Sequence, residues 1–347
     1  MKVSPTGEIE WQVESRLPVT GSHDSNLMVR TYGVIDDACG ERHGVILELS
    51  GNPTKFLQGH NLFGGFMAPG PLLELLLYRL CEILAALQPT ALDLQRWRNG
   101  HFELLRVDVN RMFGLGSRDR VRAWLQGAEH SAYMRHRGRG TLVKNGTLYF
   151  GQGSKRWSAK FYGKGDELEA GKGHGLPISL HDEPKLTAWA DDKLRFEVML
   201  RSKEIKKRDL RWAFNWSDTT GAEILKGIAE GIQMSDQKTL PTTAISNLPK
   251  RLVPVYHLWQ QGHDIRAMYP KPTFYRYRKE LLPHGIDIGV RQPYDHADRS
   301  NVVPLIRVIE AIPVGPPAWA YGTPLLVGPA DLVEARRRFQ ELKVVNY

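Results

Sequence analysis

Two short arms of alternating polar and apolar residues, at 147–150 and 157–162, constrain the fold of this chain more than any other feature. A turn rich in Gly, Ser and Lys separates the arms, which is typical of a β-hairpin. On the first arm Leu148 and Phe150 share one face, and on the second arm Trp157, Ala159 and Phe161 share one face. The other face of the second arm carries Ser158, Lys160 and Tyr162. The pattern therefore predicts a tyrosine hydroxyl and a lysine ammonium side by side on the solvent face of a sheet.

The cations around Tyr162 leave two interpretations open. A phenol with a pKa of about 10 is a poor nucleophile unless a nearby cation or metal ion stabilises the phenolate. Lys160, and Lys164 two residues beyond the tyrosine, supply such cations. Tyrosine and lysine also alternate along ordinary solvated strands. The spacing alone allows either a nucleophilic tyrosine or a plain strand face.

Three more predicted strands, at 44–50, 102–113 and 194–200, carry a carboxylate on the polar side of an apolar alternation. These carboxylates are Glu48, Asp108 and Glu197. One-sided strands build an antiparallel sheet with its apolar face under helices, so the predicted fold class is α+β. If the strands are neighbours, the carboxylates and Tyr162 share one exposed face, where oxygen ligands suit Mg²⁺ or Mn²⁺. The alternative is that each carboxylate is a separate surface group.

The composition of residues 234–249 marks a boundary between two domains. This stretch is rich in Ser, Thr, Asp and Pro and has no hydrophobic periodicity, as is typical of a linker. The sequence therefore predicts a first domain over 1–235, a linker over 236–249 and a smaller, mostly helical domain over 250–347. A last helix is expected at 330–342.

Residues 256–282 have the rhythm of a helix-turn-helix. Gly262 follows a helix that ends at Trp259, a short helix is expected at 265–269, and Thr273 is placed to cap a third helix. The third helix buries Phe274, Tyr277 and Leu281 and leaves Tyr275, Arg276 and Lys279 outward. These outward groups suit phosphates and base edges of DNA, although a plain surface helix has the same charge pattern.

The charge of the chain favours a polyanionic partner. Its 347 residues include 47 Lys and Arg against 38 Asp and Glu, a net charge of +9, and its isoelectric point is near 9.4. Two segments concentrate the excess: 117–139 has six Arg against two acidic residues, and 195–211 has seven basic residues against three acidic ones. Basic runs also occur on ordinary solvated faces, so the charge does not decide for nucleic acid by itself.

Cysteine usage and hydrophobicity indicate a cytoplasmic protein with no membrane partner. Cys39 and Cys81 are isolated, which fits a reducing cytosol and neither a disulfide framework nor a zinc motif. The N-terminus lacks a hydrophobic signal core. The most apolar run, at 72–87, contains charged residues and lies between prolines, so it predicts a core helix.

The hairpin and the acidic strands also resemble a known family. Tyr-Phe-Gly at 149–151, followed after nine residues by Phe-Tyr-x-Lys at 161–164, resembles the nucleophile motif of rolling-circle replication initiators of small Gram-positive plasmids. The acidic strands resemble motifs of the same proteins: Leu-Glu-x-x-x-Asn-Pro at 47–53, Arg-Val-Asp at 106–108 and Arg-Phe-Glu-x-x-Leu at 195–200. The gene II/X replication proteins of filamentous bacteriophages are more similar still, through Phe-Leu-Gln-Gly-His-Asn-Leu-Phe-Gly at 56–64 and Thr-Phe-Tyr-Arg-x-Arg at 273–278.

The resemblance implies an enzyme that nicks and closes DNA. Tyr162 would attack a phosphodiester and become joined to the 5′ end, and Lys160 and Lys164 would contact phosphate or stabilise the phenolate. The implied ligands of Mg²⁺ or Mn²⁺ are Asp108, Glu197 and Glu48, and the metal would polarise the scissile phosphate. Further implied DNA contacts are Arg106, Arg156 and Arg195.

The implied partners are supercoiled, double-stranded origin DNA, the displaced single strand, and the host helicase and DNA polymerase, in the cytoplasm of the bacterial host. A homodimer is possible, and the sequence does not decide the oligomeric state. Closing the displaced circle needs a second nucleophile, for which another subunit, Tyr149 and the 3′-OH are all candidates.

The chain departs from the family pattern in two places. Met112 stands where the plasmid proteins carry a further Asp, and the His-apolar-His metal motif of many other rolling-circle nucleases is absent. His60 is a further candidate ligand, or only a hydrogen-bonding residue. Two rival functions remain, a non-catalytic helix-turn-helix regulator and a plasmid mobilisation relaxase.

Overall fold

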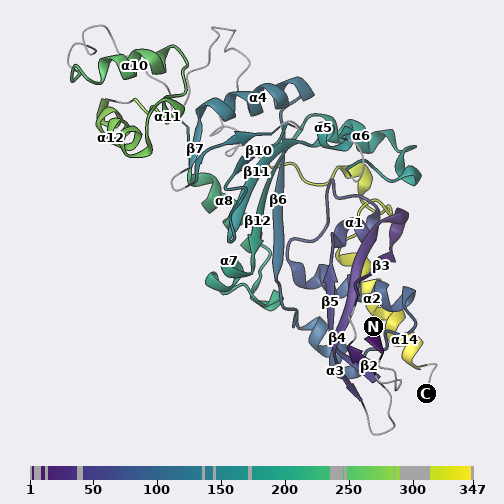
Figure 1. Ribbon diagram of the computed structural model, residues 1–347. Coiled ribbons are helices and arrows are strands. Elements are labelled where there is room, and N and C mark those ends of the chain that lie inside the picture. Colours follow the sequence, from purple (N-terminus) through teal and green to yellow (C-terminus); the bar gives the residue numbers. More distant parts are fainter. Residues whose placement is uncertain are drawn as a thin grey trace. The chain divides into compact units, whose positions relative to one another are not determined.

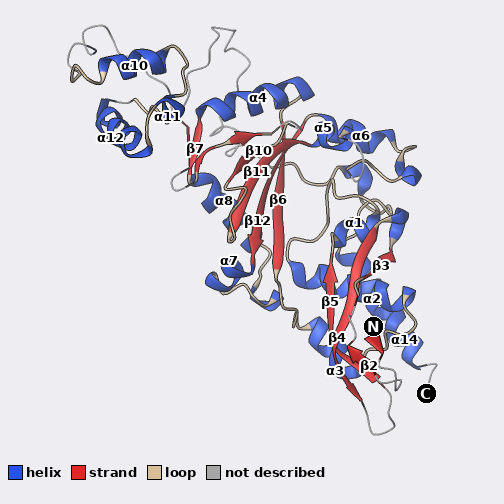
Figure 2. Cartoon of the chain, viewed as in Figure 1, coloured by secondary structure: helices blue, strands red, loops and turns tan. Residues whose placement is uncertain are grey.

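The computed structural model describes residues 2–3, 9–11, 15–36, 42–134, 137–143, 146–170, 174–234, 245, 248–284, 286–289 and 313–344. Figure 1 labels its helices and strands, and Figure 2 colours them by type. The chain forms two compact units, of which the first combines Met1–His101, Leu176–Glu183 and Pro316–Tyr347. The second comprises Phe102–Gly175 and Pro184–Gly315. This division differs from the predicted domains at 1–235 and 250–347, because the C-terminal residues pack with the N-terminal ones.

A three-stranded antiparallel sheet of order β3-β4-β5 and several helices build the first unit. Its strands are β3 (Leu17–Thr20), β4 (Asn26–Asp36) and β5 (Arg42–Ser50), beside a separate short pair of β1 (Lys2–Val3) and β2 (Ile9–Trp11). Its helices are α1 (Pro53–Gln58), α2 (Pro69–Ile83), α3 (Ala91–Arg98) and α14 (Pro329–Val344). Its 3-10 turns are η1 (Ser22–Asp24), η2 (Ile178–Leu180) and η6 (Ala318–Ala320).

The C-terminal helix α14 packs on α2, which lies where the sequence predicts a core helix. An apolar cluster joins the two helices, made of Leu75, Tyr78, Leu332 and Ala335. The buried carboxylate of Glu74 accepts hydrogen bonds from Arg336 at 2.7 and 2.6 Å and from the Tyr78 hydroxyl at 3.0 Å. Arg336 thereby fixes α14 on α2, since removing one partner of a buried ion pair is strongly destabilising. No helix in the described ranges is long and apolar enough to cross a bilayer.

The second unit is built on a five-stranded antiparallel sheet of order β6-β12-β11-β10-β9 (Figure 2). Its strands are β6 (Arg106–Gly114), β12 (Lys193–Arg201), β11 (Trp157–Gly163), β10 (Leu148–Phe150) and β9 (Thr141–Leu142). A smaller sheet joins β13 (Ile232–Met234), β7 (Ala132–Met134) and β8 (Gly138–Arg139). The helices are α4 (Arg118–Ser131), α5 (Lys164–Glu169), α6 (Pro184–Asp191), α7 (Ser202–Lys207) and α8 (Thr220–Glu230). The predicted α+β class is confirmed.

Helices cover the apolar face of the five-stranded sheet, as the one-sided strands predict. Phe161 of β11 stacks on Phe196 of β12 with ring centres 4.4 Å apart, and Trp124 of α4 lies 5.2 Å from Phe161. Gly221 of α8 lies against Val109 of β6. The opposite face is the polar one, and it carries the candidate site.

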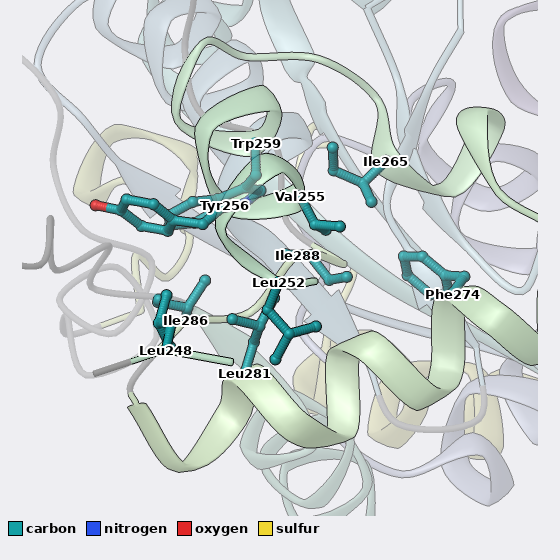
Figure 3. Close-up of a cluster of buried hydrophobic side chains, with 10 residues drawn as sticks. All are labelled: Leu248, Leu252, Val255, Tyr256, Trp259, Ile265, Phe274, Leu281, Ile286 and Ile288. Atoms are coloured by element: carbon teal, nitrogen blue, oxygen red, sulfur yellow. The ribbon is translucent and has the colours of Figure 1, made fainter. Parts of the chain in front are cut away.

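Three helices later in the second unit enclose their own apolar core: α10 (Val253–Gln260), α11 (Ile265–Met268) and α12 (Lys271–Leu281), before the turn η4 (Leu282–His284). Figure 3 shows the buried side chains of this core: Leu248, Leu252, Val255, Tyr256, Trp259, Ile265, Phe274, Leu281, Ile286 and Ile288. Gly262 adopts a φ of +84° between α10 and α11, which a turn at this position requires. The order of helices follows the predicted rhythm, while the helix-turn-helix assignment stays a prediction.

The first turn of α12 differs from the sequence prediction. The helix begins at Lys271 after Pro270, and no side chain caps it, whereas Thr273 was the predicted cap. Pro272 stands in the first turn, where a proline fits because the amide it lacks would have no partner there.

Candidate active site

Neighbouring strands of the five-stranded sheet bring the predicted catalytic side chains onto one face. β10 pairs with β11, which confirms the predicted hairpin. β11 pairs with β12, so that Tyr162 lies opposite Arg195 and Lys160 lies opposite Glu197. β12 pairs with β6, which places Asn110 opposite Glu197. All five side chains point to the same face, because directly opposed residues and residues two apart share a face.

Tyr162 is buried, with 6% of its surface exposed, so the prediction of a solvent-facing tyrosine was wrong. Its hydroxyl donates a hydrogen bond of 2.9 Å to Oε2 of Glu197. The ammonium of Lys160 lies 2.8 Å from Oε1 of the same carboxylate and 5.0 Å from the centre of the tyrosine ring. The error has a plain cause: alternation decides which face a side chain takes, but not what covers that face.

Burial raises the pKa of the Tyr162 phenol well above its ordinary value. The carboxylates of Glu197 and Glu167 raise it further, and Arg195 opposes them. The tyrosine is therefore a neutral hydrogen-bond donor in the resting site. A reaction through its oxygen needs a proton acceptor, and Glu197 is the carboxylate that already accepts the hydrogen bond.

Glu197 is held as a carboxylate although only 7% of it is exposed. Burial opposes its ionisation, but Arg195, Lys160 and the hydrogen bonds from Lys160 and Tyr162 outweigh that effect and lower the pKa of Glu197. Arg195, for which the sequence predicted a DNA contact, is itself buried and places Nε 3.6 Å from Oε2 of Glu197. Arg195 therefore helps to keep Glu197 ionised, a role that sequence reasoning missed.

Lys164 is fully buried at the start of α5, not on the strand beside Tyr162. The chain turns from strand to helix at Gly163, so the ammonium of Lys164 pairs with Glu167 one turn along the helix. Burial, together with the charge of Arg195, lowers the pKa of Lys164 to about 8. Its charge therefore changes slightly above neutral pH. The spacing of Lys164 and Glu167 could have indicated this pair, had the helix been predicted.

Asp108 lies on the same polar face as Glu197, one diagonal step away, because the residue opposite Glu197 is Asn110. Diagonal neighbours of this kind have Cβ atoms about 7–8 Å apart or slightly less. Arg106 donates two hydrogen bonds to Asp108, at 2.9 and 2.6 Å, and these raise the pKa of Arg106. Two carboxylates on one face are suitable oxygen ligands for a divalent cation.

Glu48 does not belong to this sheet, so the condition that the three carboxylate strands are neighbours is not met. It lies on β5 in the first unit, where β5 pairs with β4, its neighbour in the sequence. Hydrogen bonds from Arg30 at 2.7 Å and Arg16 at 2.5 Å lower the pKa of Glu48. His60, also in the first unit, is buried and packs edge-on against Phe63. Nowhere in the described ranges do three His, Cys, Asp or Glu side chains form a metal-binding group.

The other predicted DNA contacts lie at two places in the second unit. Arg156, just before β11, is exposed and pairs with the buried Glu204 of α7 at 2.7 Å. Tyr275, Arg276 and Lys279 lie on α12, and all three are exposed, as predicted. None of these three is needed for the core in Figure 3, so they are accessible to a ligand.

Two family models match this chain. Residues 1–219 match the N-terminal model of the phage replication-associated protein known as the gene II protein, and residues 241–326 match the C-terminal model of that protein. The replication-associated gene II protein of Enterobacteria phage I2-2 is 40% identical over 321 residues, which cover 92% of this chain and 90% of that protein. No solved structure matches the chain.

Proposed function

Because the chain belongs to the family of phage replication-associated gene II proteins, as its motifs predict, we propose that it initiates rolling-circle replication by cutting one strand of the phage origin with Tyr162. A role in phage replication follows from the family. The cutting step is supported by one observation above all, the hydrogen bond of 2.9 Å from the Tyr162 hydroxyl to a carboxylate that lysine and arginine keep ionised. That arrangement suits a tyrosine that must lose its proton when it reacts.

In the proposed reaction, Oη of Tyr162 forms a bond to the phosphorus of one phosphodiester, and the bond from phosphorus to the 3′ oxygen breaks. Glu197 accepts the phenol proton along the existing hydrogen bond. The departing 3′ oxygen takes up a proton to become a 3′-OH, and the 5′ phosphate stays on the tyrosine. Lys160 offsets charge on the phosphate as it develops, because its ammonium already lies against the tyrosine and the carboxylate.

We further propose that Asp108 and Glu197 hold Mg²⁺ or Mn²⁺. A divalent ion, when bound, polarises the phosphate. The two carboxylates are on one face of adjacent strands, and the side chain of Arg106, which now pairs with Asp108, is 56% exposed. The ion pair between Arg106 and Asp108 can therefore open to free the carboxylate for a metal ion, because the guanidinium of Arg106 stays in contact with water. Glu48, on a separate sheet and paired with two arginines, is not included.

Closing the displaced circle requires a second nucleophile, and the sheet offers Tyr149. This residue lies opposite Lys160 and so shares the polar face with Tyr162. A second subunit or the new 3′-OH would serve the same purpose. The 3′-OH left by the first cut is the primer that the host polymerase would extend, with the host helicase opening the duplex, in the cytoplasm of the host.

The test is incubation of the protein with supercoiled origin DNA and Mg²⁺, followed by gels for nicked circles and for protein–DNA adducts that resist denaturant. Wild type should give both products. Tyr162→Phe should bind the origin and give neither, while Tyr149→Phe should nick at the wild-type rate. Adducts formed by Tyr162→Phe at the wild-type rate would exclude this nucleophile. Origin binding without any adduct from wild type would favour the non-catalytic regulator.

A further inference from the structure

Two parallel aromatic rings stand at the surface of the second unit, in the loop after α7. Trp212 and Phe214 are stacked with ring centres 6.0 Å apart and an angle of 8° between their planes. Phe214 is 51% exposed, although large aromatic side chains usually lie inside. The guanidinium of Arg211 lies 5.7 Å from the centre of the Trp212 ring and extends the stack with a cation. Neither ring takes part in the candidate active site.

The backbone holds this aromatic pair in place. Arg211 accepts a hydrogen bond of 2.7 Å from the Leu104 amide, and Ala213 donates one of 3.0 Å to Phe102. The indole of Trp216 closes the loop through a hydrogen bond of 2.9 Å to the carbonyl of Leu210. The rings are therefore presented by a fixed segment, which reduces the entropy that ligand binding would cost.

Basic side chains are concentrated in the segment that leads to the pair. Three lysines of α7 are exposed, and none forms an ion pair with another residue that the structure describes: Lys203, Lys206 and Lys207. The carboxylate of the same segment, Glu204, is buried and already neutralised by Arg156 and Arg208. Residues 203–211 have five basic side chains against two acidic ones, Glu204 and Asp209, and Glu103 pairs with Arg211 at 2.8 Å. The remaining excess of positive charge argues for a polyanion rather than for a neutral protein partner.

We propose that the Trp212–Phe214 pair is a stacking platform for unpaired bases of single-stranded DNA, with the α7 lysines on its phosphates. Proteins that bind single strands combine exposed aromatic rings with a basic surface in this way, because every base has a stacking face. A duplex keeps its bases stacked on one another and offers none to the platform. The identity of the ligand rests on the proposed function, in which the cut strand is displaced from the origin.

The register of the sheet relates the platform to the cutting site. The loop is hydrogen-bonded to residues 102–104, which directly precede β6. Tyr162 lies opposite Arg195, and Arg195 lies opposite Met112, which is near the other end of β6. Met112 is six positions after Arg106, which corresponds to about 20 Å of strand. A single strand with duplex-like spacing would cover this length with about six nucleotides. The exposed Arg106 lies between the two places.

The experiment measures binding of the full chain to an oligothymidine of about 20 nucleotides and to a duplex of the same length, by fluorescence anisotropy. Phe214→Leu keeps an apolar side chain but removes the ring, and should weaken single-strand binding about 5- to 150-fold, the equivalent of 1–3 kcal/mol. Its affinity for the duplex should change less than about twofold. Phe214→Tyr should bind as wild type. Lys206→Gln with Lys207→Gln should lower the salt slope for the single strand by about 1.4.

Tyr321→Ala, which removes a 63% exposed aromatic from the first unit, is the matched control and should change neither affinity. Wild-type affinity of Phe214→Leu for the single strand, or an equal loss on single strand and duplex, would overturn the platform. Nicking of supercoiled origin DNA separates this result from the proposed function. If wild type nicks while Phe214→Leu binds oligothymidine normally, the platform is wrong and the nicking function stands. If wild type does not nick but Phe214→Leu loses single-strand binding, the nicking function is wrong and the platform stands.

Discussion

Replacing Tyr162 with phenylalanine should lower the stability of the second unit as well as abolish cutting. For a tyrosine in solvent the change would be nearly neutral, because one exposed oxygen is removed. Tyr162 is instead 6% exposed, and its hydroxyl donates to the 7% exposed Glu197. The variant keeps the ring, so packing against its neighbours is preserved. What it removes is one donor to a buried carboxylate.

The size of the loss follows from that contact. A hydrogen bond to a charged group contributes about 1.5–3 kcal/mol. The lower half of this range applies, because Lys160 at 2.8 Å and Arg195 at 3.6 Å continue to compensate Glu197. The expected loss of unfolding free energy is about 1.5–2 kcal/mol, or about 3–8 °C in the midpoint of thermal unfolding.

The measurement is urea unfolding followed by circular dichroism at pH 7, with Tyr149→Phe as the matched control. Tyr149 is half-buried on the same face, and its hydroxyl makes no hydrogen bond with the residues that the structure describes. Its variant should stay within about 0.5 kcal/mol of wild type. A double-mutant cycle of Tyr162→Phe with Glu197→Gln should give a coupling of about 1–2 kcal/mol.

The loss should also depend on pH. The pKa of Glu197 is lowered in the folded protein, so its stabilising contribution is complete above the unfolded value of about 4.3 and disappears as the pH falls through the folded value. The difference between wild type and Tyr162→Phe should therefore shrink below about pH 4. Equal stability of the Tyr162 and Tyr149 variants at pH 7, or no coupling in the cycle, would refute the contact with Glu197.

Three further predictions concern the metal, the DNA and the fold. Asp108→Asn should lose metal-dependent cutting and keep DNA affinity, and full activity at limiting Mg²⁺ would remove Asp108 from the site. Arg276→Ala should weaken origin binding by about 1–3 kcal/mol with altered sequence preference, whereas Lys279→Ala should lower the salt slope by about one for every sequence. Binding isotherms at several salt concentrations, with origin and unrelated DNA, distinguish a base contact by Arg276 from a phosphate contact by Lys279. Arg336→Ala should cost about 3 kcal/mol in urea unfolding, because it leaves a buried carboxylate on α2 unpaired, whereas the surface pair of Arg337 is worth less than about 1 kcal/mol.

The sequence predicts local alternation reliably, because a strand has a fixed side-chain period of two. It placed Lys160 and Tyr162 on one face, and Phe161 on the other, as the structure does. Asp108 and Glu197 were likewise correctly placed on polar strand faces. None of these statements requires knowledge of residues distant in the chain.

Features that depend on partners distant in the chain could not be predicted in this way. Glu48 has the same local pattern as Asp108, but its strand pairs with β4 and is part of another sheet. The expected last helix exists as α14, yet it packs on α2 at the opposite end of the chain through Arg336 and Glu74. Strand pairing and helix packing are decided by the sum of many nonlocal contacts, and a single sequence contains no direct record of them.

The charged side chains around Tyr162 determine how the site would interact with a phosphodiester. Three cations, from Lys160, Lys164 and Arg195, lie with two carboxylates, from Glu197 and Glu167, on β11, α5 and β12. Below a pH of about 8 this group carries one net positive charge, because Lys164 is then protonated. A phosphodiester has one negative charge, so its arrival would complete the balance and reduce the cost of keeping charges out of water. Above that pH Lys164 is neutral, the balance exists without DNA, and the attraction for phosphate weakens.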